Sequence, residues 1–437
     1  MRFDLVVHNG TIVTVNAAFD LIPDGMIAIR EGRLARIEAR SPDLPLPPAD
    51  ALIDARGGII MPGLVNTHTH LPMTLFRGLA DDLPLSVWLD EHIFPAEGRH
   101  INPESVRWGA LLACAEMALS GTTTCCDGYF YEDEVAEAVA GFGLRAVLGQ
   151  GLVDFPAPGV PDPARNISTA LAYAAKWQAR SATICPSLFC HAPYTCSKAT
   201  LQKAKAAADA RGLLFQIHAA ETRNEWDQIQ AAHRKTPIQY LDQLGILNSR
   251  TLLVHCVWIN AEDIETIAAR GAKVSHNPGS NMKLAAGIAP IAALLEKEVT
   301  VGLGTDGCAS NNNLDLFQEM DLAAKLHKAD TLDPTVLNAR TVLEMATIGG
   351  ARALGLETAI GSLEIGKQAD VIVIDTRRPH LVPLYHPASH LVYSANGADV
   401  KDVVVAGRIL VKDRELTNLD LAELLAQVNR ISRAIGT

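Results

Sequence analysis

Several features that would define the location or partners of a protein are absent from this 437-residue sequence. No apolar run approaches the length of about 20 residues that is needed to span a bilayer. The first residues, MRFDLVVHNGTIVTV, alternate like a β-strand and lack the basic region and continuous apolar stretch of a signal peptide. The sequence therefore predicts a soluble protein that has no membrane partner.

Basic clusters and paired cysteines are missing as well. Lysine and arginine number 38 against 49 acidic residues, which gives a net charge of -11. Nucleic acids and anionic membranes are bound mainly through positive patches, so neither is an expected partner. The eight cysteines form no CxxC pair and lie mostly in apolar runs. This pattern predicts buried thiols in a reduced, cytoplasmic protein.

The length of the chain favours one large catalytic domain and a smaller second domain. Residues 1–60 and 366–437 read as short alternating strands separated by turns, with a Leu- and Ala-rich helix at the end. They predict a small β-sandwich domain built from both ends of the chain. Residues 61–365 alternate apolar strand-like runs with Ala-rich helical segments, such as 104–120, 197–212 and 260–271.

This alternation predicts an α/β fold in which a parallel sheet is covered by helices. Seven or eight such units fit a (β/α)8 TIM barrel, whose active site lies at the carboxyl ends of the strands. The alternative, an open doubly wound sheet, would have a glycine-rich phosphate loop after its first strand, and the sequence has none there.

A metal-binding pattern stands at the start of the predicted barrel, in PGLVNTHTH. His68 and His70 are two residues apart on a predicted strand, so their side chains point to the same side. His218 in HAAE and Asp306 in GTDG each end a later apolar run. Three imidazoles and one carboxylate suit a catalytic divalent metal ion that keeps an open position for water.

Two further residues near these motifs could move protons. Glu221 follows His218 by three residues and suits a proton shuttle to a leaving nitrogen. His255, in VHC, could stabilise the attacking hydroxide or polarise the substrate, although without the other motifs a core histidine would be the better interpretation. Asp306 could take a proton from water as well as bind the metal ion. Glu221 and Asp306 would then both contact the substrate.

Two absences narrow the chemistry. The strand ends CCDGYF, GQGLVD and LFCHAP offer no lysine that could bridge two metal ions, so a site with a single metal ion is favoured. No serine or cysteine lies in a nucleophile-elbow sequence, which argues against covalent acyl transfer.

Together, PGLVNTHTH, HAAE, VHC and GTDG resemble the amidohydrolase superfamily, and more closely its branch that contains 5-methylthioadenosine/S-adenosylhomocysteine deaminases. The resemblance covers nearly the whole chain, including GTDGCASNNNLDLF and NPGSNMKLAAGIAPI. It implies that zinc, or alternatively iron or manganese, is bound by one set of residues, and that the enzyme is a homo-oligomer. The implied metal ligands are His68, His70, His218 and Asp306, and the implied catalytic residues are Glu221, His255 and Asp306.

The resemblance also implies contacts to a purine nucleoside. Trp88 and Glu97, in WLDEHIFPAE, correspond to residues that stack on the nucleoside and accept its ribose hydroxyls, and His191, in HAPYTC, corresponds to a purine contact. Read without the resemblance, Trp88 could pack in the core and Glu97 could be a surface charge. Gln150 stands where these deaminases commonly carry an arginine for the amino-acid carboxylate of S-adenosylhomocysteine. Binding of that tail is therefore expected to be weak.

The expected function is zinc-dependent hydrolytic deamination of an adenine nucleoside, namely methylthioadenosine, adenosine or S-adenosylhomocysteine. One alternative keeps the fold and the metal but acts as an aminohydrolase or chlorohydrolase on another heterocycle, such as an s-triazine, guanine or a pterin. Glu97 and Trp88 distinguish the two, because a free base has no ribose to bind. The other alternative is a non-catalytic barrel, which the full set of ligand and proton-handling residues disfavours.

Overall fold

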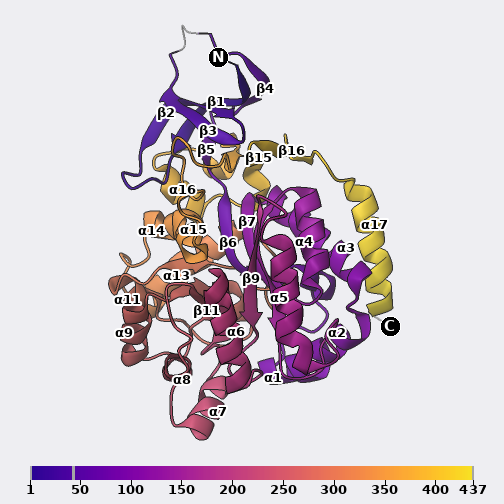
Figure 1. The fold of residues 1–437 in the computed structure, drawn as a ribbon. Coiled ribbons are helices and arrows are strands. Elements are labelled where there is room, and N and C mark those ends of the chain that lie inside the picture. Colours follow the sequence, from indigo (N-terminus) through magenta and orange to yellow (C-terminus); the bar gives the residue numbers. More distant parts are fainter. Residues whose placement is uncertain (1, 42–44, 436–437) are drawn as a thin grey trace.

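The computed structural model of the protein describes residues 2–41 and 45–435 (Figure 1). Residues 1, 42–44 and 436–437, which belong to the two predicted terminal segments, lie outside this range. The described chain forms two sheets, an eight-stranded parallel sheet and a nine-stranded mixed sheet. The parallel sheet is surrounded by helices, and the mixed sheet lies at one end of it.

The parallel sheet is a nearly closed barrel whose strands follow the order of the sequence. Its strands are β6 (Leu64–Thr69), β7 (Thr122–Tyr129), β8 (Arg145–Leu152), β9 (Ile184–Cys190), β10 (Leu214–Ala219), β11 (Thr251–His255), β12 (Lys273–His276) and β13 (Val301–Leu303). Where the first and last strands meet, the backbone N–H of Asp306 donates to the carbonyl of His68 at 3.0 Å. The predicted (β/α)8 barrel is confirmed, and its seam runs through two residues of the predicted metal site.

Helices cover the outside of the barrel between successive strands. The longer ones are α3 (Pro103–Leu119), α4 (Glu132–Phe142), α5 (Asn166–Trp177), α6 (Lys198–Arg211), α7 (Arg223–His233), α9 (Ala261–Arg270) and α13 (Leu316–Thr331), and the shorter ones are α8 (Pro237–Gln243), α10 (Pro278–Lys283), α11 (Ile291–Glu296), α12 (Cys308–Asn311), α14 (Ala339–Glu344) and α15 (Gly350–Leu354). Side chains cap several of these helices: those of Asn102, Ser197 and Asn260 each accept an N–H of the first turn that follows.

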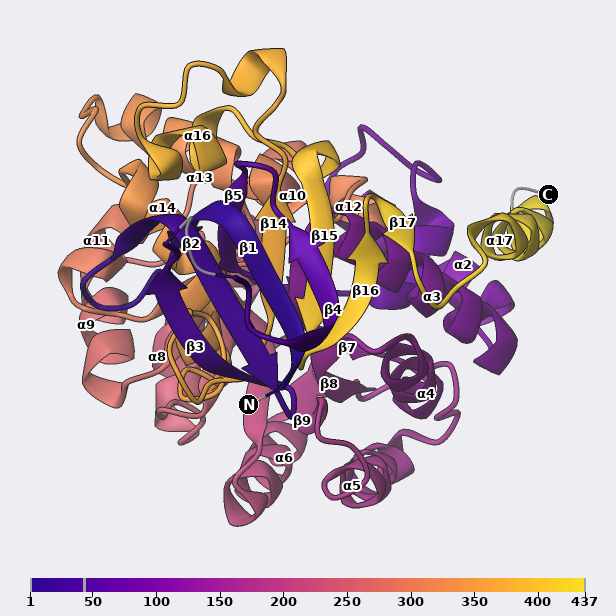
Figure 2. The same cartoon turned by 90° about the horizontal axis from the view of Figure 1, so that it is seen from above.

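The mixed sheet joins the two ends of the described chain (Figure 2). Its strands are β1 (Phe3–Val13), β2 (Leu21–Arg30), β3 (Arg33–Ala39), β4 (Ala49–Asp54), β5 (Ile59–Pro62), β14 (Val371–Ile374), β15 (Val400–Val405), β16 (Arg408–Lys412) and β17 (Glu415–Leu416). The sheet forks at β1, whose first half pairs with β4 and whose second half pairs with β5. The predicted sandwich thus takes the form of one forked sheet.

Side chains of the mixed sheet form a hydrophobic core that is separate from the large core of the barrel. It combines residues from both ends of the chain, including Leu5, Ile27, Val371 and Val404, all of which are buried. Strand β5 pairs with β14 in antiparallel register, with Ile60 opposite Val373. The two terminal segments are therefore held together by backbone hydrogen bonds as well as by this core.

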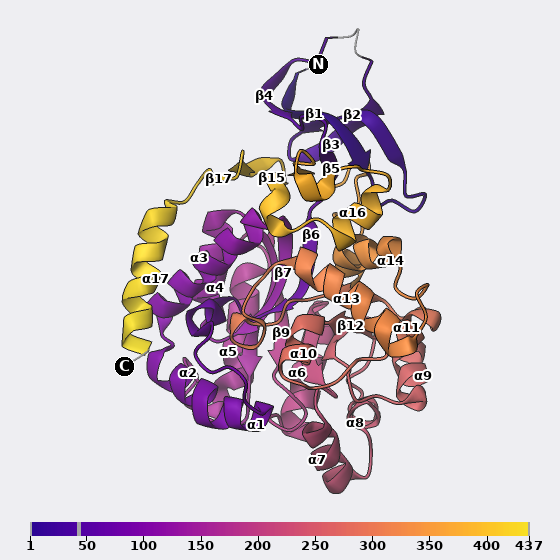
Figure 3. The same cartoon turned by 180° about the vertical axis from the view of Figure 1, so that it is seen from behind.

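The remaining helices lie along the side of the barrel and at its two ends. Helix α16 (Pro387–Tyr393) packs near the mixed sheet, and α17 (Leu421–Ile435) runs along α3 (Figure 3). The short elements α1 (Leu85–Val87), η2 (Trp88–Ile93) and α2 (Phe94–His100) lie at the end of the barrel away from the mixed sheet. Within the described residues, no helix has the length and apolar composition that crossing a membrane requires.

Candidate active site

Three histidines and one aspartate meet at the carboxyl ends of the barrel strands. His68 and His70 lie at the end of β6, His218 lies on β10, and Asp306 follows β13. The Nε2 atoms of His68 and His218 are 3.1 Å apart, and Oδ1 of Asp306 lies 3.4 Å from Nε2 of both His68 and His70. All four side chains are buried. Four residues from three distant segments thus direct ligand-type atoms at one point.

The protonation of these groups fits a divalent metal ion. The Nδ1 atom of His70 lies 2.6 Å from the carbonyl oxygen of Gly128, which can only accept, so Nδ1 carries the hydrogen and Nε2 faces the cluster with a lone pair. Burial lowers the pKa of His68 to about 4, so this ring is neutral at pH 7. Neutral imidazole nitrogens and a carboxylate oxygen are donors that zinc binds. The donor set therefore fits one cation.

Both oxygens of the Asp306 carboxylate accept hydrogen bonds from the protein. Its Oδ2 accepts the hydroxyl groups of Ser280 at 2.7 Å and Ser310 at 3.0 Å, while Oδ1 accepts the N–H of Gly307 at 2.8 Å. The backbone of Asp306 is left-handed, with φ of 60°, a strained conformation that often marks a functional residue. Ser280 and Ser310 were not predicted from the sequence, although both lie in the two segments that carry the family resemblance.

Glu221 and His255 lie next to this cluster. Nε2 of His255 is 3.9 Å from Oε2 of Glu221, and its ring centroid is 5.3 Å from that of His218. Burial raises the pKa of Glu221, and the negative charge of Asp306 adds to this effect while His255 opposes it. A carboxyl group with a raised pKa can hold a proton closer to neutral pH, as a general acid requires.

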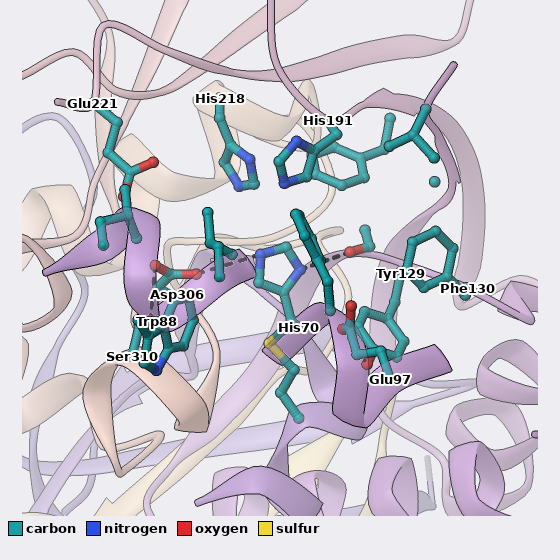
Figure 4. Close-up of a pocket in the computed structure, with 18 of the residues that line it drawn as sticks. His70, Trp88, Glu97, Tyr129, Phe130, His191, His218, Glu221, Asp306 and Ser310 are labelled. Carbon is teal, nitrogen blue, oxygen red and sulfur yellow. Dashed lines mark hydrogen bonds and ion pairs between the residues drawn. The ribbon is translucent and has the colours of Figure 1, made fainter. Parts of the chain in front are cut away.

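A pocket opens above the cluster (Figure 4). Most of its wall is aromatic or aliphatic, and the polar groups lie at its base and on one side. The apolar lining residues include Met73, Leu85, Leu89, Phe94, Phe130, Val153, Phe155, Phe189, Tyr194 and Leu284. The described residues that line it include three carboxylates, Glu97, Glu221 and Asp306, but no lysine or arginine. The pocket suits an uncharged, largely flat ligand.

Glu97 is buried on the pocket wall and has one defined partner. The hydroxyl of Tyr129 donates to Oε1 of Glu97 at 2.6 Å, which leaves Oε2 without a hydrogen-bond partner in the described structure. Burial raises the pKa of Glu97 to about 7, although the Tyr129 hydrogen bond lowers it in part. Sequence reasoning missed Tyr129, whose only signal was its place just after CCDG at the end of a predicted strand.

The structure also brings Trp88 and His191 to the pocket. Trp88, on η2, is 5% exposed and lines the wall. His191 follows β9, where its ring centroid lies 5.1 Å from that of His218 and its Nδ1 lies 2.9 Å from the hydroxyl of Thr195. Burial lowers the pKa of His191 to about 3, so the ring is neutral and can donate or accept a hydrogen bond.

Gln150 does not reach the pocket, contrary to the expectation that it would face the substrate. Side chains alternate along β8, and Gly151 lines the pocket while Gln150 points to the helix layer. There its Oε1 accepts the N–H of Glu132 at 3.1 Å, and it borders a separate cavity with Tyr131 and Lys176. The absence of an arginine at position 150 thus has no direct effect on the pocket.

Comparison with known proteins agrees with this geometry. Residues 59–410 match the model of the Amidohydrolase family. The chain is 46% identical to a 5-methylthioadenosine/S-adenosylhomocysteine deaminase of Syntrophobacter fumaroxidans, over 99% of both chains. It is 48% identical to a 5'-deoxyadenosine deaminase of Methanothermobacter thermautotrophicus, over 91% of both. A solved structure of an adenosine deaminase from Xanthomonas campestris with bound zinc superimposes with a TM-score of 0.96 at 38% identity, over 99% of both chains.

Proposed function

Because this chain belongs to the amidohydrolase family, we propose that it is a cytoplasmic, zinc-dependent deaminase that converts an adenine nucleoside to its inosine analogue and ammonia. The observation that carries this proposal is the convergence of His68, His70, His218 and Asp306 beneath a pocket that Glu221 borders. The names of the relatives, which act on adenine nucleosides, support the same reaction.

In this proposal His68, His70, His218 and Asp306 hold one zinc ion. When bound, the ion supplies the Lewis acidity that activates water at neutral pH. The Asp306 carboxylate, held by two serine hydroxyls, is placed to accept the proton of the attacking water.

Glu221 and His255 act on the substrate side of the cluster. Glu221 donates a proton to the ring nitrogen beside the attacked carbon, and its raised pKa supports this role. His255 hydrogen-bonds the oxygen that adds to that carbon. The exocyclic amine then takes up the proton that Asp306 accepted from the water, and its carbon–nitrogen bond breaks to release ammonia. The added oxygen passes its remaining proton to Glu221 and becomes the carbonyl of the inosine analogue.

The pocket wall would hold the nucleoside. Trp88 stacks on the purine, His191 hydrogen-bonds it, and Glu97 accepts the ribose hydroxyls through the oxygen that Tyr129 leaves free. A carboxylate is suited to two vicinal hydroxyls because it only accepts. A free base or a triazine would leave Glu97 unused, which is why the nucleoside is preferred over other heterocycles.

The 5' group of the substrate is proposed to be uncharged. The described lining has no lysine or arginine, and Val153, Phe155 and Phe94 contribute apolar surface. An amino-acid carboxylate held within this pocket would lose hydration without gaining a charge-assisted partner, because Arg223 and Lys283 line only the adjoining cavity. Methylthioadenosine and 5'-deoxyadenosine therefore fit better than S-adenosylhomocysteine.

We further propose a homo-oligomer, as the family resemblance implies. We also propose two domains, with residues 61–365 as the catalytic barrel and residues 1–60 and 366–437 as the second domain.

A substrate screen tests the proposed function. The zinc-loaded protein is assayed for ammonia release and for the fall in adenine absorbance with adenosine, 5'-deoxyadenosine, methylthioadenosine, S-adenosylhomocysteine, guanine and an aminotriazine. We expect the highest kcat/KM with methylthioadenosine or 5'-deoxyadenosine. Turnover of guanine or the triazine alone would support the heterocycle alternative, and no turnover of any compound by protein that retains zinc would support the non-catalytic one.

A further inference from the structure

The short segment that carries Glu221 has an unusual backbone. After β10 ends at Ala219, Ala220 adopts a left-handed conformation with φ of 53°. A residue with a β-carbon pays a conformational penalty in this region, so such a geometry persists only where the surroundings enforce it. What enforces it here also fixes the position of Glu221, the next residue in the chain.

The enforcing group is the carboxylate of Glu225. Its Oε1 accepts the N–H of Ala220 at 2.8 Å, and its Oε2 accepts the N–H of Glu221 at 2.9 Å. Because Ala220 is left-handed, its own N–H and the N–H of Glu221 point toward the same carboxylate. Successive backbone N–H groups that converge in this way form an anion-binding nest. Here the anion is a side chain of the protein itself, and it is 2% exposed.

The carbonyl side of the same segment is held independently of Glu225. The N–H of Cys256 donates to the carbonyl of Ala219 at 3.1 Å, and the N–H of Trp258 donates to that of Ala220 at 2.8 Å. Glu225 itself is placed by α7, because the Thr222 hydroxyl accepts the Glu225 N–H at 3.2 Å at the start of that helix. The N–H groups of Ala220 and Glu221, by contrast, are both bound by the single carboxylate of Glu225.

We propose that Glu225 is a positioning residue for proton transfer, which holds the Ala220–Glu221 backbone so that the Glu221 carboxyl reaches the substrate. This inference rests on the role of Glu221 in the proposed function. Glu225 does not touch the reacting atoms in this scheme. The spacing, with the second glutamate four residues after the first in HAAETRNE, places one acid at the pocket and the other behind it.

The replacement Glu225→Gln tests this role with little change of shape. The glutamine oxygen can accept only one of the two N–H groups, from Ala220 or from Glu221. The side-chain NH2 group then faces the other N–H, and that buried donor loses its acceptor. We expect kcat to fall by about 10²-fold, the loss that a displacement of about 1 Å produces. KM and zinc content should stay close to those of the parent protein, because the substrate wall and the metal ligands are untouched.

A matched control is available on another helix. Asp263 is also a buried carboxylate in the first turn of its helix, where it accepts the N–H of Asn260 at 3.1 Å and the hydroxyl of Thr236. Asp263→Asn should lower thermal stability by a similar amount but leave kcat unchanged. In the Glu225→Gln background, Ala220→Gly should recover part of kcat, since glycine adopts the left-handed conformation without penalty.

A crystal structure of Glu225→Gln provides a readout that does not depend on activity. We expect residues 219–222 to shift and the Glu221 carboxyl to leave its present position. A kcat equal to that of the parent, a loss expressed only in KM, or an unmoved segment would overturn the proposal. If Glu225→Gln does not fold, Glu225→Asp, which reaches only one N–H, should still lower kcat, and unchanged turnover in that variant would overturn it. Should the parent protein prove to lack deaminase activity, the proposed function fails while the structural comparison still tests whether Glu225 places Glu221.

Discussion

Replacing Glu97 by glutamine should make the protein more stable at pH 8 but not at pH 4.5. Burial raises the pKa of Glu97 to about 7, from the 4.5 of an exposed glutamate. Below pH 4.5 the carboxyl is protonated in both the folded and the unfolded chain, so its ionisation has no effect on the free energy of unfolding. Between about pH 4.5 and 7 the unfolded chain ionises while the folded chain keeps its proton, so stability falls as the pH rises across this range. Above about pH 7 the folded chain carries the buried charge as well, and the loss is complete.

The size of this effect follows from the two pKa values. Each pH unit between about 7 and 4.5 corresponds to 1.36 kcal/mol, so the buried charge costs about 3 kcal/mol at pH 8. Glutamine removes this cost and its oxygen can still accept the Tyr129 hydroxyl. With an unfolding entropy of about 2.1 cal/mol/K per residue, a chain of this length gains about 3 °C in Tm.

The assay is a set of thermal unfolding curves from pH 4.5 to 8.5 for the parent protein and Glu97→Gln. The exposed Glu423 provides the control Glu423→Gln, which should show no such pH dependence. The same Glu97→Gln protein should have a lower kcat/KM for nucleosides by the roughly 1.5 to 3 kcal/mol of a hydrogen bond to a charged group. A Tm difference that is constant across the pH range would refute the reasoning, because it would mean that Glu97 is not forced to ionise in a buried site.

The other predictions concern the metal, the proton carrier and the substrate tail. Purified protein should carry about one equivalent of zinc by metal analysis, and His70→Ala or His218→Ala should remove both the zinc and turnover; two bridged ions per chain, about 3.5 to 4 Å apart, would contradict this. Glu221→Gln should keep its zinc but lose 10²-fold or more in kcat, and a fall in zinc content instead would make Glu221 a ligand. S-adenosylhomocysteine should have a lower kcat/KM than methylthioadenosine. Gln150→Arg should leave the kcat/KM for S-adenosylhomocysteine no higher and should lower Tm, because the new cation would be buried against the helix layer. A rise in kcat/KM for S-adenosylhomocysteine in this variant would mean that position 150 reaches the substrate.

The sequence predicted the parts of the site that local periodicity determines. His68 and His70 share a side because a strand repeats every two residues, and the strand ends of a parallel barrel meet at one face. The same periodicity places Gln150 away from the pocket. It could be applied only by knowing which residues of GQG face inward, and the packing of β8 against β7 and β9 determines which ones do. The contacts of Tyr129 and Ser280 could not be predicted, since each partner comes from a distant segment of the chain.

The forked mixed sheet has a consequence for how the protein is made. Strand β5 can pair with β1 as soon as both leave the ribosome, but its other edge waits for β14, and Ile60 finds Val373 only after the whole barrel has been synthesised. At about 5 to 20 residues per second, that edge stays unpaired for tens of seconds. Unpaired strand edges invite association with other chains. We expect the nascent N-terminal strands to need shielding, for instance by a chaperone, until the returning C-terminal strands seal the edge, and a translation product that stops before β14 should aggregate through it.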